Sequence, residues 1–90
     1  MSQDNTAIEI ETLSQNISFH IGLADLDLER GNYFIAQENL QKALDFAIKI
    51  DDKKKIGVIH TKLAKIYYTL SETEKAIVLI NKALEIQRLT

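Results

Sequence analysis

The feature that most constrains this 90-residue chain is an internal repeat with a period of 40 residues. When residues 11–50 are aligned without gaps on residues 51–90, seven positions are identical, and most of them are alanine or leucine. The identical pairs are His20/His60, Leu23/Leu63, Ala24/Ala64, Ala36/Ala76, Lys42/Lys82, Ala43/Ala83 and Leu44/Leu84. Repeats of this length are typical of stacked helical units, each of which buries its apolar face against the next. The repeat therefore predicts an all-α fold that works by binding a partner on its surface.

The apolar spacing inside each copy also predicts helices. Apolar residues recur at intervals of three and four, which places them on one face of a helix. In the first copy they are Ala36, Leu40, Ala43, Leu44 and Ala47, on a helix predicted over 33–50. In the second copy they are Ile59, Leu63, Ile66, Tyr67 and Leu70. The repeated alanines are expected where helices approach to the short end of the usual spacing of about 8–10 Å.

Turn signals separate these helices. We expect Gly31 to close one helix in the left-handed conformation and Asn32 to cap the next. Either Asp51 or Asp52 is expected to cap the following helix. The run Lys53–Lys55 is interpreted as a solvated loop that frays into this helix, because a helix dipole disfavours cations in the first turn.

The last helix is preceded by Ser71-Glu72-Thr73-Glu74, which has the spacing of a capping box. We predict that Ser71 is its cap and that Glu74 reaches back to it. Residues 1–10 lie outside the two copies and are interpreted as a frayed extension of the first helix, which starts near Asn5. The expected organisation is one domain, with this extension followed by repeats at 11–50 and 51–90.

These motifs resemble the tetratricopeptide repeat, a helix–turn–helix unit with spaced small and aromatic residues. The matching residues are Leu23, Ala24, Gly31, Tyr33, Ala36, Leu40 and Ala43 in the first copy, and Leu63, Ala64, Tyr67, Ala76, Ile80 and Ala83 in the second. The period of 40 looks like the longer variety of a repeat whose usual period is about 34. The resemblance implies two stacked helical hairpins, which form a four-helix fragment of a right-handed α-solenoid. The sequence departs from the pattern at Asp27, Ser71 and Thr73, where an aromatic residue, glycine and tyrosine are usual.

The resemblance also implies a concave groove lined by the first helix of each repeat. Carried over by position, the groove residues are Ser18, Ile21, Asp25, Leu28 and Glu29 in the first repeat, and Val58, Thr61, Lys62, Lys65, Tyr68 and Thr69 in the second. Tyr68 is placed in the groove or in solvent because Tyr67, its neighbour, is on the packing face. Asp25 and Lys65 are expected to pair across the repeats. Ile21 and Asp25 stand where chaperone-binding members hold a peptide carboxylate, so an acidic chaperone tail is not the expected ligand.

The composition argues against several other classes of protein. The net charge of −2 does not fit a nucleic-acid surface, and Lys53–Lys55 is the one basic run. The apolar runs are too short to span a membrane, and the polar start after Met1 is no signal peptide. The chain has no cysteine, which is compatible with the cytoplasm and excludes disulfides and thiolate zinc sites. We expect no cofactor and no small-molecule substrate, because neither a phosphate-binding glycine loop nor a nucleophile elbow is present.

The two histidines are the candidates for chemistry. His20 and His60 occupy equivalent positions, and neither has a carboxylate or another histidine at i+3 or i+4. We interpret them as partly buried packing residues. A pH-sensing pair and a shared metal site are the alternatives. The chain is therefore not expected to be an enzyme.

Two hypotheses for function remain. In the first, the chain is a module that binds a peptide or protein in the groove, within a signalling or regulatory protein. In the second, it is a structural element that assembles with itself. The last helix carries apolar residues that its own hairpin cannot cover, and no further helix follows in these 90 residues. Ile77 and Leu84 are therefore predicted to form the contact of a symmetric homodimer.

Overall fold

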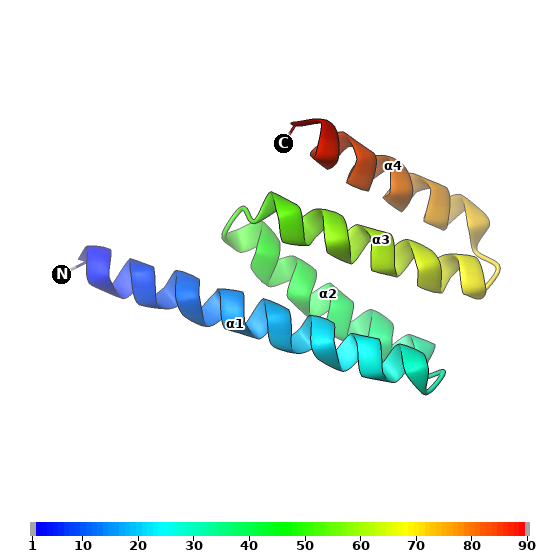
Figure 1. The fold of residues 1–90 in the computed structure, drawn as a ribbon, viewed down its shortest axis with the longest axis horizontal. Coiled ribbons are helices and arrows are strands. Elements are labelled where there is room, and N and C mark those ends of the chain that lie inside the picture. The colour runs from blue at the N-terminus through cyan, green and yellow to red at the C-terminus, as the bar shows by residue number, and fades with distance from the viewer. Residues whose placement is uncertain (1, 90) are drawn as a thin grey trace.

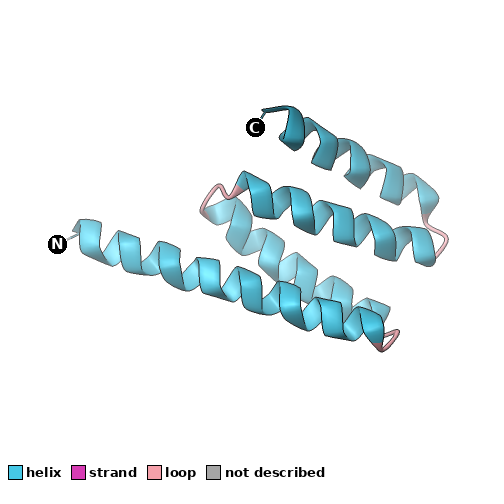
Figure 2. Ribbon diagram, in the orientation of Figure 1, coloured by secondary structure: helices cyan, strands magenta, loops and turns pink. Residues whose placement is uncertain are grey.

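The computed structural model describes the backbone of residues 2–89 and the side chains of residues 6–88. The described part of the chain forms the helices α1 (Ser2–Glu29), α2 (Tyr33–Lys49), α3 (Lys53–Thr69) and α4 (Thr73–Leu89) (Figures 1 and 2). Each helix packs antiparallel against the one before it, so that α1 and α4 lie at opposite ends of the row. The molecule is flat, with extents of 49 × 31 × 13 Å. This arrangement confirms the two stacked helical hairpins.

The core lies along the seams between successive helices. Its largest fully buried side chains are Ile17, Leu40, Ile59 and Ile66. The alanines that the two repeats share are all buried, namely Ala24, Ala36, Ala43, Ala64, Ala76 and Ala83. A methyl group leaves room for a neighbouring helix, so the burial of these alanines agrees with the expectation that they lie between helices.

The three turns share one backbone geometry. The residue that follows each C-cap has a left-handed φ: 76° at Gly31, 54° at Asp51 and 66° at Ser71. The backbone N–H of the next residue then donates to a carbonyl five positions back, as in the bond from Glu72 to Tyr67 at 2.7 Å. The same bond joins Asn32 to Asp27 and Asp52 to Ala47, which makes each turn a Schellman motif.

This shared geometry corrects two of the expected caps. Ser71 is not the cap of α4, because it occupies the left-handed position of the turn, as Gly31 does, and α4 begins only at Thr73. The capping-box prediction was therefore wrong. Asn32 stands at the N-cap position of α2, but its side chain makes no capping hydrogen bond. Asp52 does cap α3, since its Oδ1 accepts from the backbone N–H of Lys55 at 3.1 Å.

Three boundaries also differ from the expectation. Lys53–Lys55 form the first turn of α3 instead of a loop, because the Asp52 cap holds the start of the helix there. α1 begins at Ser2 instead of near Asn5, and it runs without a break because residues 2–21 contain neither glycine nor proline. α2 ends at Lys49, one residue before the predicted Ile50.

Candidate functional site

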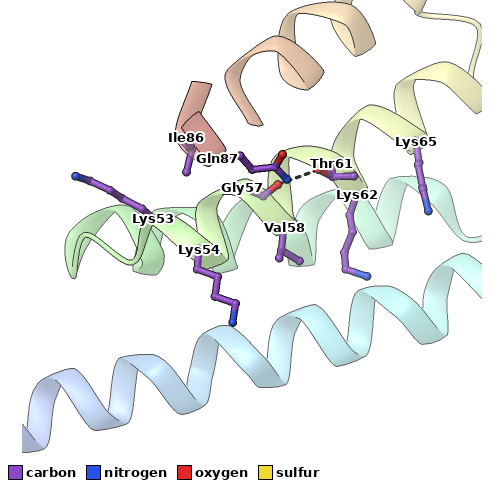
Figure 3. A pocket seen from close by; sticks show the side chains of 9 residues that line it. All are labelled: Lys53, Lys54, Gly57, Val58, Thr61, Lys62, Lys65, Ile86 and Gln87. Carbon is purple, nitrogen blue, oxygen red and sulfur yellow. Dashed lines mark hydrogen bonds between the residues drawn. The ribbon is translucent and has the colours of Figure 1, made fainter. Parts of the chain in front are cut away.

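A cleft of about 550 Å³ opens along one side of α3. Seven of its lining residues come from α3 and two from the C-terminal end of α4: Lys53, Lys54, Gly57, Val58, Thr61, Lys62, Lys65, Ile86 and Gln87 (Figure 3). Lys54, Val58, Lys62 and Lys65 project to the same side, toward α1 (Figure 3). The cleft is therefore built by the second hairpin, and part of its lining faces α1.

The cleft owes its depth to a difference between the two repeats. Ile17 is completely buried in the first hairpin, whereas the equivalent residue in the second hairpin is Gly57. A Cβ atom added at Gly57 would meet nothing nearer than Cγ2 of Ile86, at 3.8 Å. The missing side chain leaves space between α3 and α4, and Ile86 forms part of its apolar wall.

The electrostatics of the cleft are dominated by four lysines. Lys62 donates to Oδ1 of Asp25 on α1 at 2.8 Å. Lys53, Lys54 and Lys65 have no ion-pair partner among the described residues. Lys54, Lys62 and Lys65 therefore form a cationic row on the side of α3 that faces α1, although the net charge of the chain is −2. The observed ion pair corrects the expected pairing of Asp25 with Lys65, because Lys62 is the lysine of α3 that reaches the carboxylate.

The structure brings together only part of the predicted groove. Val58, Thr61, Lys62 and Lys65 line the cleft. Thr61 is tied to the helix, because its hydroxyl donates to the carbonyl of Gly57 at 3.0 Å. The other predicted residues lie outside the cleft lining: Ser18, Ile21, Asp25, Leu28, Glu29, Tyr68 and Thr69. Among them, Ile21 and Leu28 pack against the core cluster.

The tyrosine pair behaves as the helical geometry predicts. Tyr67 packs against the core and accepts a hydrogen bond from Nε2 of Gln37 on α2 at 3.1 Å. Lys75 of α4 lies 5.5 Å from the centre of the same ring. Tyr68 is largely exposed. A rotation of about 100° between successive residues separates the two rings.

The sequence analysis missed five lining residues: Lys53, Lys54, Gly57, Ile86 and Gln87. A signal for one of them was present, because Lys54, Val58, Lys62 and Lys65 are spaced by four, four and three residues, on one helical face. The interpretation of Lys53–Lys55 as a loop concealed it. Ile86 and Gln87 carry no local signal, since their place in the wall depends on how α4 crosses α3.

The two histidines have different surroundings. Nδ1 of His20 donates to Oδ1 of Asn39 at 3.1 Å, and Nδ2 of Asn39 donates to Oδ2 of Asp27 at 3.0 Å. His60 is buried, and its Nδ1 has no hydrogen-bond partner among the described residues. Burial, and to a smaller extent the charge of Lys82, lower the pKa of His60 below its usual value of 6.5. His60 is therefore neutral at pH 7.

The described residues contain no group of three or more histidine, cysteine, aspartate and glutamate side chains that could hold a metal ion. None of their helices is long and apolar enough to cross a membrane.

No curated protein and no solved structure is significantly similar to the chain. A family model described as tetratricopeptide repeat matches residues 15–88, which cover both hairpins and all three turns. Repeats of this family generally mediate protein–protein interaction. With its period of 40 residues, its buried alanines and its two stacked hairpins, the chain belongs to the tetratricopeptide repeat family.

Proposed function

We propose that the chain binds a segment of another protein in the cleft along α3, and that this segment carries acidic residues next to an apolar one. The observation that supports this most directly is that Lys54 and Lys65, which have no ion-pair partner among the described residues, project to the same side of α3 as the apolar Val58 (Figure 3). Complementary charge would steer an acidic segment to this side of the molecule. An apolar side chain that enters the cleft would supply the desolvated contact that binding needs.

The ion pair between Lys62 and Asp25 joins α3 to α1 beside the proposed site. Both side chains remain partly exposed, so the pair contributes at most about 1 kcal/mol to stability. It links α1 to α3 on the side to which Lys54 and Lys65 also project, and it leaves these two lysines free to contact a ligand. We expect Lys62, Lys65 and the exposed Tyr68 to be among the contacts of a bound segment.

The test uses a fluorescently labelled peptide of alternating glutamate and leucine, together with its glutamine counterpart. We expect the acidic peptide to bind and the glutamine peptide to bind much less. Amide shift mapping should place the footprint on Lys54, Val58, Thr61 and Lys65. A footprint on the exposed faces of α2 and α4 would contradict the choice of surface.

Charge reversal at the cleft gives a sharper form of this test. The double change Lys54→Glu and Lys65→Glu should weaken the acidic peptide by about tenfold or more and flatten its salt dependence. The matched control reverses two exposed lysines of α2, Lys42→Glu and Lys49→Glu, which alters net charge equally. Equal losses in both variants would mean that only net charge matters and that the cleft is not the site.

We place this module in a cytoplasmic protein with a signalling or regulatory role. The absence of cysteine is compatible with that setting. A binding surface without catalytic groups also suits a module that brings other proteins together. Sequencing of the intact gene product would test this, since an adjoining output domain would identify the role directly.

A second candidate function is self-association through α4. Ile77, Ile80 and Leu84 are about half exposed and follow one side of this helix. An uncovered apolar strip of this kind marks an interaction surface. Sedimentation equilibrium tests this candidate, and a chain that stays monomeric at roughly 0.5 mM would contradict it.

A further inference from the structure

The bare strip on α4 has a covered counterpart in the same molecule. Leu40 and Leu44 of α2 occupy the positions equivalent to Ile80 and Leu84. Leu40 and Leu44 are 0% and 8% exposed, whereas Ile80 and Leu84 are 47% and 46% exposed. The reason is the number of neighbours, because α2 lies between α1 and α3 while α4 packs mainly against α3. The strip on α4 is therefore the surface that a following helix covers in the first repeat.

The other end of the row shows the complementary surface. Ile59 and Ile66 of α3 are equivalent to Phe19 and Leu26 of α1. Ile59 and Ile66 are 0% and 1% exposed, whereas Phe19 and Leu26 are 60% and 48% exposed. Here α3 packs against both α2 and α4, while α1 packs mainly against α2. The bare face of α1 is thus the surface that a preceding helix covers in the second repeat.

The chain therefore carries both halves of one interface, exposed at its two ends. From this we propose that copies of the chain stack head to tail, with α4 of one copy against α1 of the next in the manner of α2 against α3. The proposal rests on the self-association put forward above and names its geometry. A symmetric contact between two α4 helices would leave Phe19 and Leu26 in water, whereas head-to-tail stacking covers both faces.

The internal contact also supplies a register. Gln37 of α2 and Tyr67 of α3 are hydrogen-bonded at 3.1 Å. Their counterparts in the stacked pair are Ile77 of one copy and Asp27 of the next, so this hydrogen bond is not reproduced. The contact then relies on its apolar side chains.

Charges at the rim agree with this register. Glu74 lies one turn before Ile77, and Arg30 lies one turn beyond Asp27. Because the helices would run antiparallel, Glu74 of one copy reaches the level of Arg30 of the next. Both residues are exposed, so the pair favours the correct alignment more than it adds affinity. A contact of this heterologous kind repeats without closing and gives open chains of molecules.

The experiment blocks one face at a time. One variant carries Ile77→Lys and Leu84→Lys on α4, and the other carries Phe19→Lys and Leu26→Lys on α1. All four positions are exposed, and circular dichroism melts check that both variants fold. Ile48→Lys, at an exposed apolar residue of α2 outside both faces, is the matched control. Sedimentation equilibrium then follows each protein alone and an equimolar mixture of the two variants.

Head-to-tail stacking predicts a specific pattern of masses. The unmodified chain and the Ile48→Lys control should grow beyond the dimer as concentration rises, and each blocked variant alone should remain a monomer. The mixture should form a dimer of twice the 10.2 kDa chain mass, because each variant retains the face that the other lacks. If the α1 variant dimerises alone, the contact is symmetric through α4 and the stacking proposal is overturned. If the unmodified chain is monomeric, self-association is overturned with it, while binding at the cleft is unaffected.

Discussion

The two hairpins share one backbone arrangement but differ in which equivalent positions are buried. In the first hairpin, Ile17 and Leu40 are completely buried and hold the core together. In the second, Gly57 opens a cleft where Ile17 fills space, and Ile80 is half exposed where Leu40 is covered. The comparison teaches that equivalent positions in a repeat acquire different roles from their neighbours as well as from their residue type. The apolar face of α2 is covered while the equivalent face of α4 is half exposed, and the second hairpin carries all the residues that line the cleft.

The largest expected effect is a difference in unfolding free energy between substitutions at two equivalent positions, Leu40 and Ile80. Leu40→Ala should lower the free energy of unfolding by about 2–5 kcal/mol, because it empties a fully buried site. Ile80→Ala should cost much less, since about half of that side chain already contacts water. Denaturant titrations of both variants measure the difference. Similar losses at the two sites would remove the contrast between the hairpins.

The repeated alanines give the next test. Ala43→Leu should destabilise the fold by about 1–3 kcal/mol, because it overpacks a close helix contact that is covered on both sides. Ala83→Leu should fall at the lower end of that range, since α4 packs mainly against α3. Ala7→Leu, at an exposed position of α1, serves as the control and should change little. Thermal melts that rank the three variants equally would contradict the alignment of the repeats.

Substitutions at two equivalent turn positions should change the stability in opposite directions. Ser71→Gly should stabilise the chain by roughly 1 kcal/mol, because Ser71 holds a left-handed φ of 66° that costs a residue with a Cβ atom. Gly31→Ala should destabilise it by a similar amount at the equivalent turn, where φ is 76°. Urea titrations report both changes. A loss of stability in Ser71→Gly would restore a capping role for the serine hydroxyl.

The smallest expected effect is a pH dependence that arises in the second hairpin. The pKa of His60 is lowered in the folded state, so below about pH 6.5 the unfolded chain binds the proton more readily. Stability from this group is complete above that pH and is lost as the pH falls toward the folded pKa. Replacement of His60 by leucine should flatten the decline between about pH 7.5 and about pH 5.5.

A second substitution checks the cause of that dependence. Lys82→Gln removes the charge that adds to the effect of burial, so its decline should lie between those of the unmodified chain and the His60→Leu variant. An unchanged slope in the His60→Leu variant would assign the decline to other groups.

Much of the fold was predictable from sequence because it depends on local pattern. The 40-residue spacing of Ala43 and Ala83, with the intervals of three and four around them, indicated the helices and their close contacts. Gly31 indicated its turn because glycine favours the left-handed region. Asp51 and Ser71 adopt the same left-handed turn geometry, but neither residue type indicates it. The serine suggested a helix cap, although the backbone at this position has a left-handed φ.

The candidate site was predictable only in part. Val58, Lys62 and Lys65 followed from the family resemblance, and they do line the cleft. Ile86 did not, because its place depends on how α4 lies over Gly57. Lys65 was expected to be the partner of Asp25, but the observed partner is Lys62, one turn earlier. How far α1 is shifted along α3 depends on tertiary packing, which the sequence pattern does not give. Sequence pattern thus gives the face of each helix, but not how two helices are aligned.

The most direct test of the contrast between the hairpins is native-state hydrogen exchange on the unmodified chain, at a concentration low enough to prevent association. The measured quantity is the protection of backbone amides at equivalent positions of α2 and α4. The account predicts that the amides of Ala43 and Leu44 exchange more slowly than those of Ala83 and Leu84, because α2 packs against two helices and α4 mainly against one. Equal protection in the two helices, or slower exchange in α4, would contradict it.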